Sequence, residues 1–217
     1  MAGGSVPRAM PERFADLSPE AFRRVDETRD ALFYASPRMV AHVDERAQEA
    51  LRALHGELLA PGMRVLDLMS SRHSHLPPDM ALELRGHGMS RAELDANPAL
   101  SRRFVQDLNV DPVLPLYDGA FDAALCALSV QYLLRPVAAF REVARVLRPG
   151  GPFAVSFSNR CFPTKAIALW RDAGSADRTR YVELAMAEAR LEGVEARELL
   201  PEDGMGDPLW AVVGHAP

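Results

Sequence analysis

Short apolar runs alternate with stretches of helical periodicity along most of the chain. Several runs are apolar almost throughout, which is typical of strands covered on both faces. The predicted strands lie at 65–68, 81–85, 103–108, 121–130 and 152–159. Between them, Ser90 and Glu93 form a capping box, and Pro136 opens a helix whose apolar positions continue to Leu147. Strands that alternate with helices predict a mostly parallel sheet in an α/β fold.

The segments that follow predict one edge of this sheet. Helical stretches at 165–171 and 175–190 lead to GVEARELL and PLWAVVGH, two strand-like segments with no helix between them. Parallel neighbours need a long crossover, whereas antiparallel neighbours do not. We therefore predict an antiparallel edge after the parallel strands.

Two helix-start signals precede the first strand. Ser18 with Pro19, and Ser36 with Pro37, each place an N-cap residue before proline. After the second signal, apolar residues recur at helical spacing as far as Leu58. We therefore expect a flexible arm, a helical extension that could act as a lid, and an α/β domain, at 1–17, 18–59 and 60–217.

Composition narrows the classes of function. The 217 residues include 48% hydrophobic and 25% charged residues, as expected for one globular domain. The net charge is -5 and there is no run of five basic residues, so nucleic acid is not an expected partner. The two cysteines lack metal or redox spacing, and no export signal or apolar stretch of membrane-spanning length is present. We expect a cytoplasmic protein with no metal and no membrane partner.

Roughly residues 60 to 215 resemble class I S-adenosylmethionine-dependent methyltransferases. The resemblance rests on three segments: RVLDL, the block that runs from LPLYDG through RVLRPGG to SFS, and the terminal DPLWAVVGHA. The resemblance implies a doubly wound, mostly parallel, seven-stranded Rossmann-like sheet with an antiparallel edge strand. It also implies S-adenosylmethionine as cofactor. FYASPRMVAHVD, DLMSSRHSHLP and SFSNRCFPTKA are similar to an uncharacterised methyltransferase-like subgroup.

The loop after the first strand departs from the pattern of this superfamily. Asp67 is in place, but Met69, Ser71 and His73 occupy positions where the superfamily has glycines. Glycine tolerates a positive φ, whereas each other residue forced into it costs roughly 1 kcal/mol or more. We therefore expect the loop to take a different path, with room for only a short helix before the second strand.

The second strand lacks the acidic residue that, by the resemblance, accepts the ribose hydroxyls. Gly88 stands at that position. Losing such a charge-assisted pair costs roughly 2 to 3 kcal/mol, or about 30- to 150-fold in affinity. His87 or Glu83 could compensate if the strand points either side chain into the pocket.

Other residues are assigned to the cofactor by the same resemblance. Asp107 matches the residue that contacts the adenine amino group, and Leu108 would flank the ring. Tyr34 and Arg38 could fold over the pocket and hold the methionine carboxylate, or could lie at a solvated helix end. The predicted cofactor-binding residues are Tyr34, Arg38, Asp67, Met69, Ser70, Ser71, Gly88, Met89, Asp107, Leu108 and Ser129.

Three residues are candidates for catalysis. His73 and His75 could supply a general base, because imidazole titrates near neutral pH; half of a metal site is the weaker alternative. Tyr132 could orient a substrate or simply be an aromatic at a strand end. Arg160 and Lys165 could bind an anionic substrate, although a solvated loop is the simpler interpretation.

These observations leave two functions open. The first is a methyltransferase that acts on a small-molecule substrate and could form a homodimer. The second is a methyltransferase-like protein that performs no methyl transfer and serves as a ligand sensor, a partner-binding subunit or a catalyst of another reaction. The altered loop and the missing ribose-binding acid motivate the second.

Overall fold

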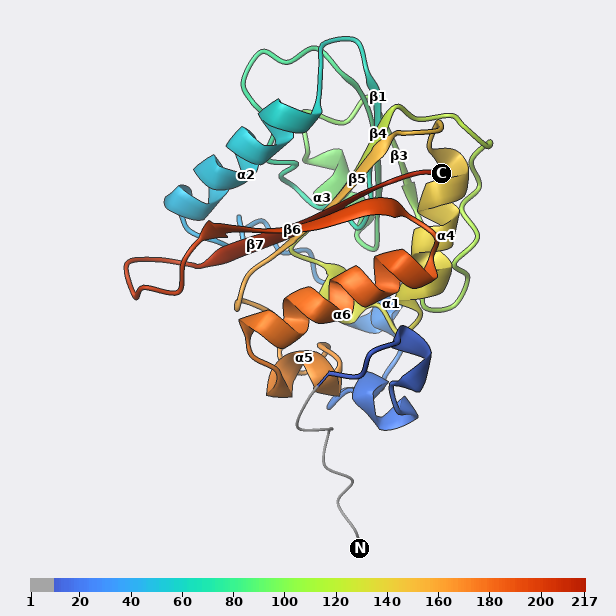
Figure 1. The fold of residues 1–217 in the computed structure, drawn as a ribbon. Coiled ribbons are helices and arrows are strands. Elements are labelled where there is room, and N and C mark those ends of the chain that lie inside the picture. The colour runs from blue at the N-terminus through green and yellow to red at the C-terminus, as the bar shows by residue number, and fades with distance from the viewer. Residues whose placement is uncertain (1–9) are drawn as a thin grey trace, which may run out of the picture.

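The computed structural model describes residues 10–217 (Figure 1). Of the predicted flexible arm, residues 1–9 lie outside the described part of the chain. Residues 10–17 include a 3-10 turn, Phe14–Asp16, which packs against helix α6 (Ser175–Glu188). The Phe14 ring lies 5.6 Å from the ring of Tyr181 on that helix. This part of the arm is therefore held by the folded domain.

Seven strands form one mixed sheet in the order β3-β2-β1-β4-β5-β7-β6. The first five strands pair in parallel, and β7 runs antiparallel to both β5 and β6. The strands are β1 (Arg64–Asp67), β2 (Glu83–Gly88), β3 (Arg102–Val105), β4 (Ala123–Ala127), β5 (Pro152–Phe157), β6 (Glu192–Leu200) and β7 (Leu209–His215). The predicted Rossmann-like sheet with an antiparallel edge is confirmed.

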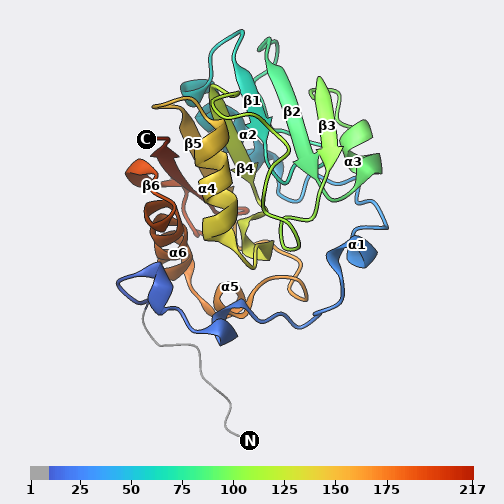
Figure 2. The same cartoon turned by 90° about the vertical axis from the view of Figure 1, so that its right-hand side faces the viewer.

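Helices cover both faces of the sheet, and Figure 2 shows α4 (Pro136–Val146) on one side of it and α2 (Glu45–Leu58) on the other. The remaining helices are α1 (Asp30–Phe33), α3 (Arg91–Asp95) and α5 (Ala168–Asp172), with further 3-10 turns at Pro19–Phe22 and Val130–Tyr132. None of the helices in the described residues is long and apolar enough to cross a bilayer.

The strands are buried on both faces because their neighbouring residues point to opposite sides. Val65 packs with the cluster that includes Leu59 and Leu94, whereas Leu66 packs with the cluster around Phe140 and Trp170. A strand of period two sandwiched between helices needs apolar residues at every position. This accounts for the nearly continuous apolar runs in the sequence.

The N-terminal extension differs from the prediction. Only one 3-10 turn, Pro19–Phe22, forms after Ser18, and the long helix begins at Asp44 rather than at Ser36. Asp44 is the N-cap because its carboxylate accepts the Ala47 N–H at 2.9 Å. The residues between α1 and α2 take an irregular path. They become part of the site described below.

Lys165 anchors this extension and is not in a solvated loop, which corrects the simpler interpretation of its sequence position. Its side chain is 0% exposed, and its Nζ donates to the Thr28 carbonyl at 2.6 Å. The carboxylates of Asp26 and Asp30 lie 3.2 and 3.3 Å from the same nitrogen. Arg24 forms a second buried ion pair with Asp30 at 2.7 Å. These contacts fix the chain from 24 to 30 onto the domain.

Replacing the buried ammonium tests this anchor. Lys165→Met should lower the free energy of unfolding by about 3–5 kcal/mol, because breaking a buried ion pair leaves uncompensated carboxylates. Trypsin should then cleave faster after Arg24 and Arg29. Urea unfolding and limited proteolysis measure both effects. As a control, Arg180→Met removes the exposed pair with Glu183 and a long, exposed hydrogen bond to the Glu12 carbonyl, and should cost less than about 1 kcal/mol. Equal small losses in the two variants would contradict the anchor.

Candidate functional site

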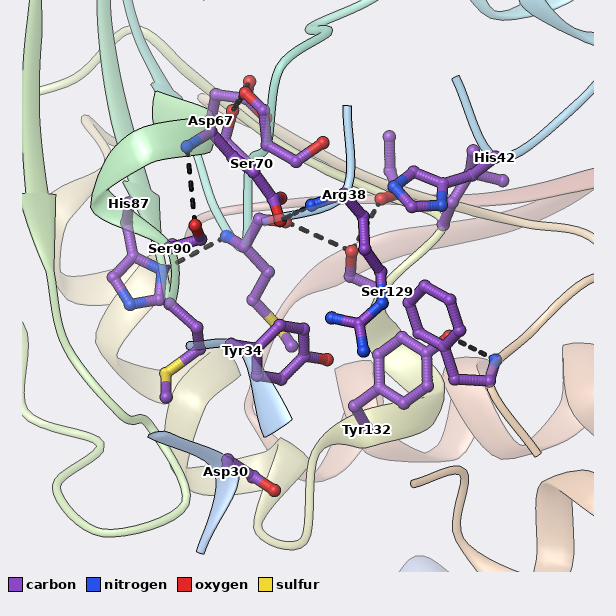
Figure 3. A pocket seen from close by; sticks show the side chains of 18 of the residues that line it. Asp30, Tyr34, Arg38, His42, Asp67, Ser70, His87, Ser90, Ser129 and Tyr132 are labelled. Atoms are coloured by element: carbon purple, nitrogen blue, oxygen red, sulfur yellow. Dashed lines mark hydrogen bonds between the residues drawn. The ribbon is translucent and has the colours of Figure 1, made fainter. Parts of the chain in front are cut away.

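A cavity of about 320 Å³ lies at the carboxyl ends of the parallel strands. Its floor comes from the residues that follow β1, β2, β3 and β4, and residues 30–43, here called the covering segment, contribute a further wall. The order β2-β1-β4 makes this the topological switch point, where doubly wound sheets bind ligands. Figure 3 shows Tyr34 and Arg38 of the covering segment with Ser129 and Tyr132 around this space.

The structure brings every predicted site residue onto the wall of this one cavity. They come from the covering segment, from the loop after β1, and from the ends of β2, β3 and β4. The residues are Tyr34, Arg38, Asp67, Met69, Ser70, Ser71, His73, His75, Gly88, Met89, Asp107, Leu108, Ser129 and Tyr132. This placement concerns position only, and the individual roles stay predictions.

Asp67 organises the loop after β1. Its carboxylate is buried and accepts hydrogen bonds from the hydroxyls of Ser70 and Ser74, each at 2.6 Å. The Asn97 amide donates in turn to Ser74 Oγ and to the Ser71 carbonyl. Burial raises the pKa of Asp67 to about 6, and the two hydroxyl bonds partly oppose that rise. The serines therefore secure the loop from within.

One of the three residues at expected glycine positions has a backbone conformation that favours glycine. Met69 has φ +56°, the left-handed conformation that favours glycine, whereas Ser71 and His73 do not adopt a positive φ. Met69 therefore adopts the conformation that carries a cost for residues other than glycine. Hydrogen bonds hold the strained residue on both sides, because its N–H donates to His87 Nδ1 and its carbonyl accepts from Ser129 Oγ. No helix forms between β1 and β2 in this described segment.

Gly88 shows why no acid stands at the end of β2. A Cβ at this position would lie 2.4 Å from the Ser70 carbonyl oxygen, well inside contact distance. The loop after β1 thus rests directly on the end of β2. A carboxylate-bearing side chain at position 88 would require the loop to move, so the missing acid and the altered loop are one structural change.

Neither predicted replacement for that acid can accept the ribose hydroxyls, because His87 lines the cavity with both ring nitrogens already bonded and Glu83 is not part of the cavity wall. His87 Nδ1 accepts the Met69 N–H, so Nε2 carries the proton that it donates to the Gln106 carbonyl at 3.0 Å. Burial lowers the pKa of His87 to about 4, and the ring is neutral at physiological pH. Glu83 is exposed at the first residue of β2. Both compensation hypotheses are therefore wrong.

Besides His87, three further histidines line the cavity: His42, His73 and His75. The rings of His73 and His75 lie 6.1 Å apart. Burial, with a smaller effect of neighbouring histidines, lowers the pKa of His75 to about 3, so this imidazole holds a proton weakly. His73 is exposed and is the better general base of the two. Within residues 10–217, no group of three His, Cys, Asp or Glu side chains comes together as a metal site.

Arg38 points its guanidinium into an aromatic cage. Its Cζ lies 4.0 Å from the ring centre of Phe33 and 4.7 Å from that of Phe162, distances typical of cation–π contacts. One guanidinium nitrogen donates to the carbonyls of Phe33 and Ser36, each at 3.3 Å. No carboxylate pairs with it in the described part of the chain. Arg38 is therefore a cation on the cavity wall that is held in place by aromatic rings and backbone carbonyls.

Tyr132 lines the cavity and also bonds to the rest of the protein. Its hydroxyl accepts the Phe162 N–H at 2.8 Å, and the two rings stack 5.9 Å apart. Burial raises the pKa of the phenol to about 12. The hydroxyl can still donate its proton to a ligand, but it will not ionise near neutral pH. This favours an orienting role over an acid–base role.

The wall at the end of β3 is held by an asparagine. Asp107 lines the cavity and accepts the Asn109 N–H at 3.0 Å, while Leu108 is buried beside it. The Asn109 amide donates to Asp30 and to the Tyr132 carbonyl, each at 2.9 Å. One side chain thus joins the end of β3, the covering segment and the turn after β4.

Comparison with known proteins agrees with this architecture. Residues 80–155 match a family described as "Methyltransferase domain". A similar chain occurs in the Haloferax volcanii complex between the Trm112 methyltransferase activator and a methyltransferase. The two chains superpose with a TM-score of 0.59 at 19% identity, and the match covers 78% of this chain and 91% of that one. The chain has the class I methyltransferase fold.

Two further solved structures illustrate the range of this fold. The [4+2]-cyclase SpnF gives TM-score 0.59 at 18% identity, covering 78% of this chain and 81% of that chain. The Haemonchus contortus phosphoethanolamine N-methyltransferase 2 with S-adenosyl-L-methionine gives 0.57 at 13% identity, covering 78% and 52%. No curated protein sequence matches the chain significantly. Sequence identities this low support a shared fold but not a shared function.

Several residues of this cavity were not predicted as parts of it, among them His42, Glu93, Asn109 and Phe162, whose contacts shape its wall. Glu93 was predicted as half of a capping box, yet its carboxylate bonds Arg38 N instead of the Ser90 N–H. His42 and Phe162 lie in the motifs FYASPRMVAHVD and SFSNRCFPTKA, so the unusual polar and aromatic content of those segments was the available signal. Asn109 carried no local signal.

The close approach of the loop to Gly88 can be tested by adding one methyl group. Gly88→Ala should lower the free energy of unfolding by about 1–3 kcal/mol, because its Cβ must displace the Ser70 carbonyl. Urea unfolding measures the loss. Gly174→Ala is the matched control, since no atom lies within 4 Å of its new Cβ, and it should cost less than about 1 kcal/mol. If the two variants were equally stable, the contact would not matter.

The buried His87 predicts a pH dependence. Its pKa of about 4 lies below the ordinary 6.5, so between these values the unfolded chain binds a proton that the folded chain does not. The contribution of His87 to the free energy of unfolding is fully present above pH 6.5. It falls by about 1.4 kcal/mol per pH unit as the pH drops toward 4. The stability gap between the wild type and His87→Asn should therefore narrow from pH 7 to pH 5 in urea unfolding. His73→Asn, at an exposed site, should show a smaller change; a constant gap for His87→Asn would refute the prediction.

Proposed function

We propose that this protein is an S-adenosylmethionine-dependent methyltransferase that acts on a small molecule. The observation that carries the proposal is the order of groups along the cavity. Asp107 stands at the end of β3, Gly88 at the end of β2, Asp67 and Met69 at the end of β1, and Ser129 after β4. An extended nucleoside with an amino-acid tail can meet a suitable group at each strand end.

The residues present fit the cofactor at both ends of this line. At one end, Asp107 offers a carboxylate oxygen to an exocyclic amino group, and Leu108 offers an apolar surface to the ring. At the other end, Arg38 has no acidic partner in the described residues and faces the cavity as a cation. A carboxylate is the natural partner for such a guanidinium. We assign the methionine carboxylate to it.

When bound, the cofactor supplies a methyl group activated by its sulfonium. The chain would then contribute mainly alignment and exclusion of water, which can account for several kcal/mol of a barrier. Tyr132 can orient the acceptor through its hydroxyl proton, and His73 can take a proton where the acceptor must lose one. His75 is the weaker candidate because of its low pKa.

A small-molecule substrate suits the enclosure of the site. The covering segment contributes Tyr34, Arg38 and His42 to the wall, which leaves limited space beside a cofactor. The net charge of -5 argues against a polyanionic partner. A homodimer stays a prediction.

A specific observation favours a second function, which is a reaction other than methyl transfer. Gly88 carries no ribose-binding acid, and the Ser70 carbonyl prevents one from being added. The name of the cyclase SpnF shows that a similar fold can be associated with a different reaction. In this alternative the cavity binds another ligand, or binds the cofactor without transferring its methyl group.

Calorimetric titration with S-adenosylmethionine and S-adenosylhomocysteine separates these functions. We expect a Kd below about 100 μM, and a thermal shift that corresponds to about 2.7 kcal/mol at 100-fold excess over Kd. Asp107→Ala and Arg38→Met should each weaken binding by about 10-fold or more, because each removes a polar or charge-assisted contact. The exposed controls Asp172→Ala and Arg102→Met should bind like the wild type.

Failure of both ligands to bind would refute the methyltransferase proposal and favour the second function. Tight binding that survives both cavity substitutions would refute the residue assignments. Binding without any methylated product from a panel of small amines, acids and phenols would favour the second function with the cofactor retained as a ligand.

A further inference from the structure

The carboxylate of Glu93 is an incompletely bonded acid on the cavity wall. Its residue is only 6% exposed, in the first turn of α3. Oε1 accepts the Arg38 backbone N–H at 2.7 Å. Among residues 10–217, no other hydrogen bond and no ion pair reaches this carboxylate. Buried charges are normally paired or fully hydrogen-bonded, so the second oxygen can accept from a donor inside the cavity.

Glu93 lines the same cavity as Gly88, the position where an acid is missing from β2. A Cβ at Gly88 would lie 3.2 Å from the side chain of Leu94, so the first turn of α3 packs directly on the end of β2. The sheet order places this point between the end of β3, with Asp107, and the end of β1, with Asp67. A nucleoside whose base lies at Asp107 and whose tail lies over β1 therefore carries its sugar past Glu93.

The neighbouring polar groups cannot serve the sugar equally well. Both ring nitrogens of His87 are used by Met69 and Gln106. The carboxylate of Asp67 is bonded to two serine hydroxyls. A vicinal diol offers two O–H donors and needs an acceptor, and an ionised carboxylate is the strongest acceptor among side chains.

We propose that Glu93 accepts the ribose hydroxyls of the bound nucleoside and so replaces the acid absent at position 88. This inference rests on the proposed cofactor. Because the same carboxylate bonds Arg38 N, the sugar and the covering segment would share one group. The selectivity of the site for a ribonucleoside then depends on α3 rather than on the end of β2.

The experiment compares S-adenosylhomocysteine with its 2′,3′-dideoxy analogue by calorimetry. The wild type should prefer the dihydroxy ligand by about 10-fold or more, the range expected for hydrogen bonds to a charged group. Glu93→Gln keeps an oxygen for the Arg38 N–H but replaces the free oxygen with a donor, so the preference should fall to about 3-fold or less. Glu83→Gln is the control, since Glu83 is exposed at the other end of β2, and it should keep the wild-type preference.

Each result decides the matter. If Glu93→Gln folds and keeps the preference, or if the wild type binds both ligands equally, the assignment of Glu93 is overturned while the cofactor proposal stands. If the wild type binds neither ligand nor S-adenosylmethionine, the cofactor proposal fails and this inference fails with it. The wild-type comparison needs no variant, so it remains decisive even if Glu93→Gln does not fold.

Discussion

The contact between the loop after β1 and Gly88 determines the shape of the whole site. The Ser70 carbonyl lies where a side chain at position 88 would begin, and Asp67 holds that carbonyl in place through two serine hydroxyls. Met69 accepts a left-handed conformation within the same loop. A strained backbone of this kind persists only where its surroundings determine it fully, and it is common at functional sites. Here the surroundings are the buried ring of His87 and the hydroxyl of Ser129.

The other wall of the cavity depends on a buried cation, the ammonium of Lys165. Lys165 binds the chain between 26 and 30, and Asn109 joins Asp30 to the turn after β4. The covering segment then needs only a few further contacts, such as Arg38 N to Glu93, to stay in place over the strand ends. Its position is therefore set by polar interactions at its base together with the packing of Phe33 and His42 against Phe162.

The sequence predicted the sheet well and the extension poorly, for a physical reason. Strands such as β4 and helices such as α4 are specified by local periodicity and by proline and glycine at their ends. The helix start at Asp44 and the burial of Lys165 depend on partners more than a hundred positions away, Asp207 and Asp26 among them. Such long-range polar contacts leave no periodic signal.

The site shows the same division. Strand-end residues such as Asp67 and Asp107 could be placed from their position relative to apolar runs. The direction of His87 could not, because both faces of a covered strand look alike in sequence. The capping signal at Glu93 was read correctly as a helix start, but a carboxylate that leaves its own cap for a distant backbone N–H cannot be recognised locally.

The position of β7 between β5 and β6 has a consequence for how the chain reaches its native state. During synthesis, β5 and β6 leave the ribosome before β7 does. β5 can already pair with β4, but β6 is hydrogen-bonded to the sheet only through β7. Until residues 209–215 emerge, β5 offers an open edge and β6 has no neighbour in the sheet. The sheet is therefore completed late, by pairing with the last strand. Until then, the unpaired edge of β5 could pair with strands of other chains and lead to aggregation.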